Sequence, residues 1–205
     1  AYISDFAKRQ PSKAFSNDLS AAEAECAKAK LAKKLPVALG SPIGYKAAFT
    51  NPVMQQRFGV DGPKWGYMYD RNMVDIIAVL PHDMGTRLQF EADMIVEVKD
   101  AGLADAKSPL EALAHLESVV PFIELPDLVV EAPMKLNGAG VAAINVGARL
   151  GVVGEPIAVP AGQVERQALL EALRDMTVTV SDGSPAPLNA SKGSAILEQP
   201  LNAVV

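Results

Sequence analysis

The sequence predicts an α+β protein with a predominantly antiparallel sheet. Capped, helix-favouring stretches alternate with short runs of β-prone residues, and Gly, Pro and Asp separate the runs. With 49% of its 205 residues hydrophobic, the chain has enough apolar material for a core. A net charge of −5 gives no indication of a nucleic-acid partner. No stretch approaches the roughly 20 apolar residues that a membrane span requires.

The first part of the chain is expected to be helical. Ser20 and Glu23 have the spacing of a capping box, and Pro36 should end the helix that they begin. Pro52 and Gly59 have the positions of a helix start and a helix stop. The expected elements are a helix at 20–34, a turn at 36–40, a strand at 43–50 and a helix at 52–58. We therefore expect a helical lobe at 1–36, followed by a β-rich domain at 37–205.

The remainder of the chain alternates between β-prone and helical stretches. Ser108 and Glu111 form a second cap pattern, and Asp182-Gly183 is typical of a tight turn after a strand. The expected elements are loops and short strands at 59–90, a strand at 90–99, a helix at 108–117, strands at 119–124 and 128–130, an apolar glycine-rich stretch at 138–154, a helix at 163–174 and a strand at 176–180.

Three carboxylates lie in or beside apolar, β-prone runs, where an unpaired charge is costly. Glu91 and Asp93 are two residues apart, so in a strand they would share one face. Glu124, from another strand, could complete an all-oxygen site for a hard cation such as Mg²⁺ or Mn²⁺. The alternative is that these acids simply face water, as acids on half-solvated strands commonly do.

Lys46 lies in a strand-like run between Tyr45 and Ala47. A lysine held near a metal and an apolar wall can act in proton transfer. Local sequence alone favours the other interpretation, in which the lysine extends along the strand end into water.

Several motifs follow one another within residues 37–205. They are the segment from Gly44 to Gly66, the pair Glu91-x-Asp93, Pro121 to Asp127, Asn145 with Gly151 to Gly154, Gly193 to Leu197, and Pro200 to Val204. Together they resemble the 2-keto-4-pentenoate hydratase group of the fumarylacetoacetate hydrolase superfamily, in which the first segment is the signature and an E-x-E pair stands where this chain has E-x-D.

The resemblance implies a mixed, mainly antiparallel β-sandwich or β-roll of the fumarylacetoacetate-hydrolase type. It also implies a hydratase-like lyase that acts on a small unsaturated 2-oxo acid through a metal-bound enolate. By matched position, Glu91, Asp93 and Glu124 would hold Mg²⁺ or Mn²⁺, and Lys46 would transfer protons. Weaker candidates for substrate contacts are Thr50, Trp65, Asp127 and Asn145. A homo-oligomer is expected from the same resemblance.

The chain departs from the family pattern at four places. Asp93 replaces a Glu, Leu128-Val129 replaces a Ser-Arg pair, and Lys64 stands where an acid is frequent. The sequence also ends at Val205, where the family continues, so the β-rich domain is expected to be truncated at its C-terminus. These departures leave two alternatives open: a C–C bond hydrolase or decarboxylase with the same site, and a non-catalytic binding or structural subunit.

Two further features bear on cofactor and compartment. His82 and His115 are the only histidines, so a zinc site with several His ligands is not expected. Members of this family are commonly cytoplasmic, so the resemblance favours the cytoplasm. The start at Ala1 leaves a periplasmic or secreted form open.

Overall fold

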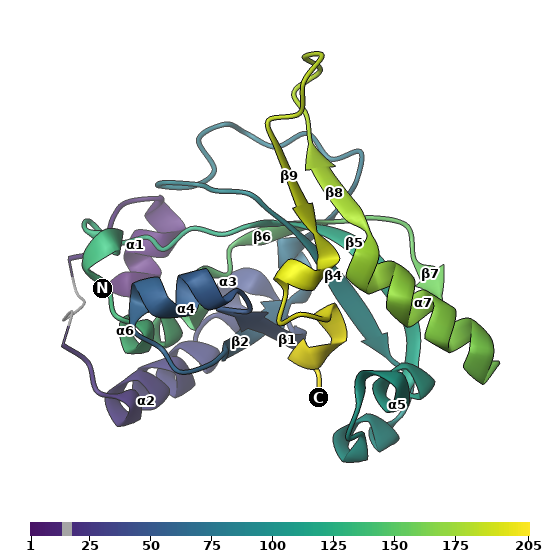
Figure 1. Ribbon diagram of the computed structural model, residues 1–205. Helices are drawn as coiled ribbons and strands as arrows, with labels where there is room; N and C mark the ends of the chain where they lie inside the picture. The colour runs from purple at the N-terminus through teal and green to yellow at the C-terminus, as the bar shows by residue number, and fades with distance from the viewer. Residues whose placement is uncertain (14–17) are drawn as a thin grey trace. The chain divides into compact units, whose positions relative to one another are not determined.

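The structure is a computed structural model that describes residues 1–13 and 18–205 (Figure 1). It consists of two compact units. Unit 1 comprises Ala1–Glu91 and Ile123–Val153, and unit 2 comprises Ala92–Phe122 and Gly154–Val205. The proposed boundary at residue 36 falls within unit 1, and the division into a helical lobe and a β-rich domain stays a prediction.

Unit 1 begins with helices whose ends follow local sequence signals. In α2, the Ser20 hydroxyl accepts from the Glu23 N–H and the Glu23 carboxylate accepts from the Ser20 N–H, so the expected capping box is present. Pro36 opens a short helix where we expected a turn, since proline suits the first turn of a helix as well as its end. The elements are α1 (Tyr2–Lys8), α2 (Ala21–Ala32), α3 (Pro36–Leu39), β1 (Pro42–Ala48), α4 (Pro52–Phe58), β2 (Lys64–Tyr69), β3 (Met73–Asp75), α6 (Gly138–Ala143) and β6 (Leu150–Val153).

The strands of unit 1 form two groups. Strands β1 and β2 pair antiparallel, with Lys46 opposite Gly66. Strand β3 runs parallel to β6, and β6 lies beside β5 (Leu116–Leu125), whose last residues belong to this unit. One apolar cluster joins the helices to these strands; it contains Tyr2, Phe6, Leu31, Leu35, Tyr69, Val129, Val130, Leu136, Val141, Ile144 and Val146.

Unit 2 has its own core. Strand β5 lies beside β4 (Glu91–Val98) and pairs antiparallel with β7 (Ile157–Ala158). Helices α5 (Pro109–Ala114) and α7 (Gln163–Asp175) contribute to a cluster of Leu113, Leu116, Val119, Leu173 and Leu201. Strands β8 (Thr177–Val180) and β9 (Asn189–Lys192) form a hairpin that continues from the end of α7 (Figure 1).

The structure corrects or completes the sequence-based element assignments at further places. The helix expected at 108–117 ends at Ala114 because β5 already begins at Leu116. Residues 128–130 form only a single bridge, between Ser12 and Val130, and not a strand. The stretch at 138–154 divides into α6, a left-handed turn and β6. Within residues 1–13 and 18–205, no helix is both long enough and apolar enough to cross a membrane.

Candidate active site

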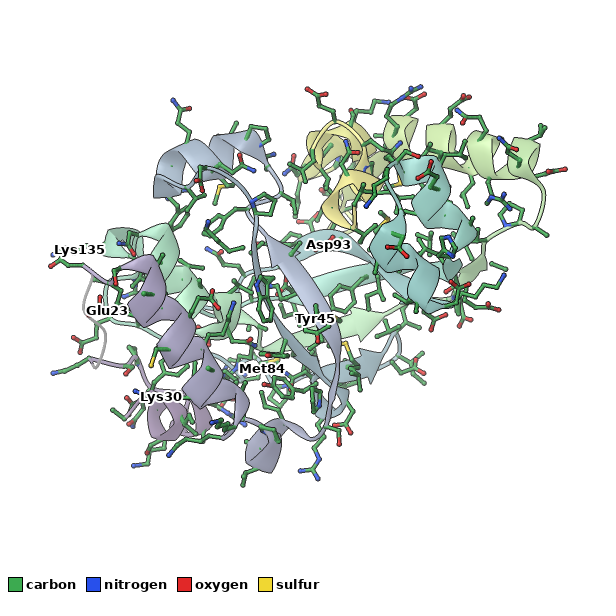
Figure 2. All side chains as sticks on the ribbon, turned by 90° about the horizontal axis from the view of Figure 1, so that it is seen from below. Glu23, Lys30, Tyr45, Met84, Asp93 and Lys135 are labelled. Atoms are coloured by element: carbon green, nitrogen blue, oxygen red, sulfur yellow. The ribbon has the colours of Figure 1, made fainter. Side chains whose placement is uncertain are left out.

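Lys46 and Glu124 form an ion pair in unit 1. The Lys46 Nζ donates to Oε1 of Glu124, and the two residues come from β1 and β5, 78 positions apart in sequence. Only 12% of the lysine side chain and 6% of the glutamate side chain remain exposed. Lys46 therefore points inward, and the interpretation in which it extends into water is wrong. Its neighbour Tyr45 lies on the opposite, exposed face of β1 (Figure 2).

Gly66 allows close packing directly opposite Lys46 in the β1–β2 pair. A Cβ at this position would lie 2.9 Å from the backbone oxygen of Asn145 and 2.7 Å from Cγ2 of Val146. The absence of a side chain thus lets β2 approach the turn at Asn145. This turn helps to place the strand pair that carries Lys46.

Asn145 holds β2 through both ends of its side-chain amide. Its Oδ1 accepts from the backbone N–H of Tyr67 at 2.7 Å, and its Nδ2 donates to the Tyr67 carbonyl at 3.0 Å. These contacts give Asn145 a structural role within unit 1. The contact with substrate that we expected for it stays a prediction.

The turn that contains Asn145 has a left-handed backbone. The φ angles of Asn145, Val146 and Gly147 are 57°, 49° and 72°. This conformation is ordinary for glycine and tolerated by asparagine, but costly for the β-branched valine. The carbonyl of Gly147 accepts from the backbone N–H of Asp127 at 2.9 Å. The strained turn therefore connects β2 to the segment that follows β5.

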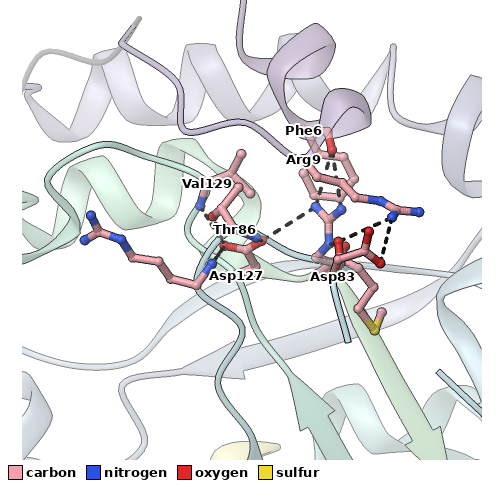
Figure 3. Close-up of polar contacts among 9 residues, drawn as sticks. Phe6, Arg9, Asp83, Thr86, Asp127 and Val129 are labelled. Carbon is pink, nitrogen blue, oxygen red and sulfur yellow. Dashed lines mark hydrogen bonds and ion pairs between the residues drawn. The ribbon is translucent and has the colours of Figure 1, made fainter. Parts of the chain in front are cut away.

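The side-chain carboxylate of Asp127 is fully buried and receives several hydrogen bonds (Figure 3). Thr86 donates its backbone N–H at 2.6 Å and its hydroxyl at 2.5 Å. The backbone N–H groups of Arg87 and Val129 donate at 3.3 and 3.2 Å, and Nη1 of Arg149 lies 3.8 Å away. The described contacts of this carboxylate are thus all with other residues of unit 1. A contact between Asp127 and substrate stays a prediction.

Glu91 and Asp93 lie at the start of β4, two residues apart as expected. Glu91 is exposed, whereas Asp93 is partly buried and its Oδ1 accepts from the Met94 N–H at 2.9 Å. Among the described residues, no group of three or more His, Cys, Asp or Glu side chains is arranged to hold a metal ion. The assignment of Glu91, Asp93 and Glu124 as a ligand set stays a prediction.

Trp65 and Thr50 flank the β1–β2 pair. Trp65 is partly exposed; its ring contacts Tyr45 edge-on at 5.6 Å, and Nζ of the buried Lys28 lies 3.4 Å from its centroid. Lys28 also donates to the backbone carbonyl of Trp65 at 3.4 Å, so α2 is attached to β2 at this point. Thr50 is partly buried in the turn between β1 and α4. The roles of Trp65 and Thr50 toward a substrate stay predictions.

Sequence reasoning missed the contribution of Arg149. Its Nε donates to the Met84 carbonyl at 2.7 Å, and its guanidinium lies 4.5 Å from the Phe6 ring. Burial lowers the pKa of Arg149, and the nearby Asp127 opposes this effect. A signal was present, because Arg149 is the only charged residue in the apolar stretch 138–154. A charge in such a run predicts a buried partner.

No protein-family model matches the chain. Solved structures with a similar fold include two of 4-oxalocrotonate decarboxylase from Pseudomonas putida G7. The complex with magnesium and adipate has a TM-score of 0.80 and 19% identity, over 98% of this chain and 74% of that chain. The complex with calcium and acetate has a TM-score of 0.76 at the same identity and coverage. The chain thus has the fold of this enzyme, which agrees with the expected α+β class.

Proposed function

We propose that the chain is a divalent-metal-dependent enzyme that acts on a small 2-oxo acid as a hydratase-like lyase. The observation that carries this proposal is the buried pair of Lys46 and Glu124. Both residues were singled out by motif position, and the fold brings them together across 78 positions. The shared fold supports the proposal, since the decarboxylase with that fold is complexed with magnesium and adipate in one structure and with calcium and acetate in the other.

The chemistry of the three proposed ligand side chains suits a hard cation. Glu124 is almost fully buried and already lies against a positive group, the ammonium of Lys46. Glu91 and Asp93 add carboxylate oxygens of the kind that Mg²⁺ and Mn²⁺ prefer. Glu124, Glu91 and Asp93 are therefore the proposed ligands. When bound, the cation would supply charge neutralisation for the substrate carboxylate and polarise its 2-oxo group.

Lys46 is the proposed proton-transfer residue. As an ammonium, its Nζ could donate a proton to a carbon next to the 2-oxo group, and as a neutral amine it could accept one. In the structure the ammonium is held by Glu124, which fixes its position on the inner face of β1. Thr50 and Trp65 are the proposed substrate contacts at the edge of the β1–β2 pair.

A decarboxylase is the second candidate, and one observation favours it. The two solved structures described above are of a decarboxylase, although 19% identity establishes the fold alone. The two activities differ in their products, because a hydratase adds water across a double bond and a decarboxylase releases CO₂. Incubation with unsaturated 2-oxo acids, followed by mass analysis and CO₂ detection, would distinguish them.

The first test is calorimetric titration of the protein with Mg²⁺ and Mn²⁺, with and without oxalate as an analogue of a 2-oxo acid enolate. We expect binding that oxalate tightens and that Glu124→Ala abolishes. Glu117→Ala is the matched control, because Glu117 is an exposed acid on the same strand. A folded wild type that binds neither ion would contradict the proposal. Light scattering on the same samples would test the expected homo-oligomer.

A further inference from the structure

We propose that Asp127 is a positioning residue that holds the segment leading into Glu91, and so sets where the first proposed metal ligand lies. This inference rests on the proposed function. It concerns unit 1 alone, because Thr86 to Glu91 and Asp127 all belong to that unit.

The segment before β4 is attached to Asp127 at consecutive residues. The Asp127 carboxylate accepts two hydrogen bonds from Thr86 and one from the backbone N–H of Arg87. The neighbouring Pro126 carbonyl accepts from the backbone N–H of Gln89 at 3.1 Å. Residues 86–89 thus lie along the segment that follows Glu124 on β5.

Glu91 lies two residues beyond the last of these contacts, at the first position of β4. An extended chain advances by about 3.3 Å per residue, so the backbone of Glu91 lies within about 7 Å of residue 89. Glu124 is three residues before Asp127 on the other side. The contacts of Asp127 therefore limit how far the backbones of the two proposed ligands can separate.

Arg149 also belongs to this network. Its side chain is only 9% exposed, and its Nη1 lies 3.8 Å from the Asp127 carboxylate. It also donates to the carbonyls of Met84 and Phe6. Arg9, directly after α1, donates to Asp83, so the end of α1 is joined to the loop that contains Asp83, Met84 and Thr86. Hydrogen bonds therefore hold the loop of residues 83–89 on both sides of Thr86 as well as at Thr86 itself.

A purely structural role would make Asp127 matter for stability alone. A positioning role also predicts an effect on metal binding. Loosening residues 86–91 should weaken the affinity for Mg²⁺ even in protein that remains fully folded. Groups that orient metal ligands through hydrogen bonds change metal affinity by about 10- to 100-fold when removed. This difference makes the two roles separable by experiment.

The central variant is Asp127→Asn, which keeps the shape but removes the charge and one acceptor. Two readouts are used: amide hydrogen exchange of the peptide covering 84–91, and the Mg²⁺ dissociation constant from calorimetry. We expect exchange in this peptide to accelerate at least about tenfold and Mg²⁺ affinity to fall by about 10- to 100-fold. The control is Asn137→Ala, which removes the side-chain cap of α6 in the same unit. It should change neither readout.

A milder pair of variants keeps the test valid if Asp127→Asn does not fold. Thr86→Val removes the hydroxyl that donates to Asp127, whereas Thr86→Ser retains it. We expect Thr86→Val to weaken Mg²⁺ binding by about three- to tenfold and Thr86→Ser to restore wild-type affinity. Unchanged exchange at 84–91, or wild-type affinity in both Asp127→Asn and Thr86→Val, would overturn the inference while leaving the proposed function intact. A wild type without Mg²⁺ binding would overturn both.

Discussion

Lys46 and Glu124 are joined by an ion pair from which water is almost fully excluded, with 12% and 6% of their side chains exposed. Removing two charges from water costs several kcal/mol for each ion, and the attraction between them often only offsets this cost. A well-packed apolar pair would therefore serve the fold at least as well. The presence of a charged pair at this position supports a chemical role, such as the proton transfer and metal binding proposed above.

Replacing Lys46 alone should be strongly destabilising. Lys46→Met leaves the carboxylate of Glu124 buried without its partner, and breaking such a pair typically costs about 3–5 kcal/mol. Urea unfolding, followed by circular dichroism, would measure the change in the free energy of unfolding. Saturating Mg²⁺ should recover more stability in this variant than in the wild type, because the ammonium no longer competes for Glu124.

The double variant Lys46→Met/Glu124→Leu is the control for this prediction. With both charges removed, the free energy of unfolding should return to within about 1–2 kcal/mol of the wild type. The Mg²⁺-dependent stabilisation should be absent. If Lys46→Met unfolds at the same urea concentration as the wild type, loss of the Lys46–Glu124 ion pair does not lower the free energy of unfolding, and the prediction is wrong.

Asn145 should be sensitive to alanine for two separable reasons. Alanine loses both hydrogen bonds to Tyr67, each worth about 1 kcal/mol, and adopts the left-handed backbone at a cost of about 1 kcal/mol. Asn145→Gly loses the same hydrogen bonds but tolerates a φ of 57°. We expect Asn145→Ala to destabilise by about 2–4 kcal/mol and Asn145→Gly by about 1 kcal/mol less, as measured by chemical denaturation. Equal losses would show that the backbone strain assigned to this turn is absent.

Elements with local signals were predicted well from the sequence. Helix α2 has the capping box of Ser20 and Glu23, and α4 ends at Gly59, whose φ is 62°. Strand β4 was recognised from its β-prone run within one residue at each end. In each case the physical cause lies within a few residues of the element, so it can be read from the sequence.

Features that depend on distant partners could not be predicted from local pattern alone. Lys46 pairs with Glu124, which is 78 positions away in sequence. Local sequence alone favours a lysine that extends into water. No residue next to Asp127 in sequence indicates that Thr86 and Arg149 surround its carboxylate. The left-handed φ of Val146 contradicts the preference of a β-branched residue, so only the packing of the whole turn explains it.

Gly66 should not tolerate a side chain. The Cβ of Gly66→Ala would lie 2.9 Å from the Asn145 carbonyl oxygen, a backbone atom, and 2.7 Å from Cγ2 of Val146. Overpacking of this kind costs about 1–3 kcal/mol. The measurement is again chemical denaturation, with Gly44→Ala as the control, because a Cβ at Gly44 in β1 meets nothing within 4 Å. Equal stability of the two variants would refute the close approach of β2 to the turn.

Asp100 in unit 2 should contribute stability that depends on pH. Hydrogen bonds from the backbone N–H of Gly102 and from the His115 ring, whose Nδ1 lies 2.7 Å from Oδ1, lower the pKa of Asp100. A lowered pKa in the folded state means that the stabilisation is fully present above the ordinary carboxyl pKa of about 4. It is lost as the pH falls through the lower, folded-state value.

Asp100→Asn tests this prediction, because asparagine keeps the side-chain oxygen that caps Gly102 but lacks the charge. We expect the melting temperature of the variant to be below that of the wild type at neutral pH, and the difference to disappear as the pH falls through the lowered pKa of Asp100. Asp105→Asn is the control, since Asp105 is an exposed acid at the end of the short 3-10 helix Ala101–Asp105 that Asp100 caps. A difference between wild type and Asp100→Asn that stays constant from neutral to acid pH would mean that the charge of Asp100 contributes nothing. The contact with His115 would then stabilise this corner of unit 2 only through its geometry.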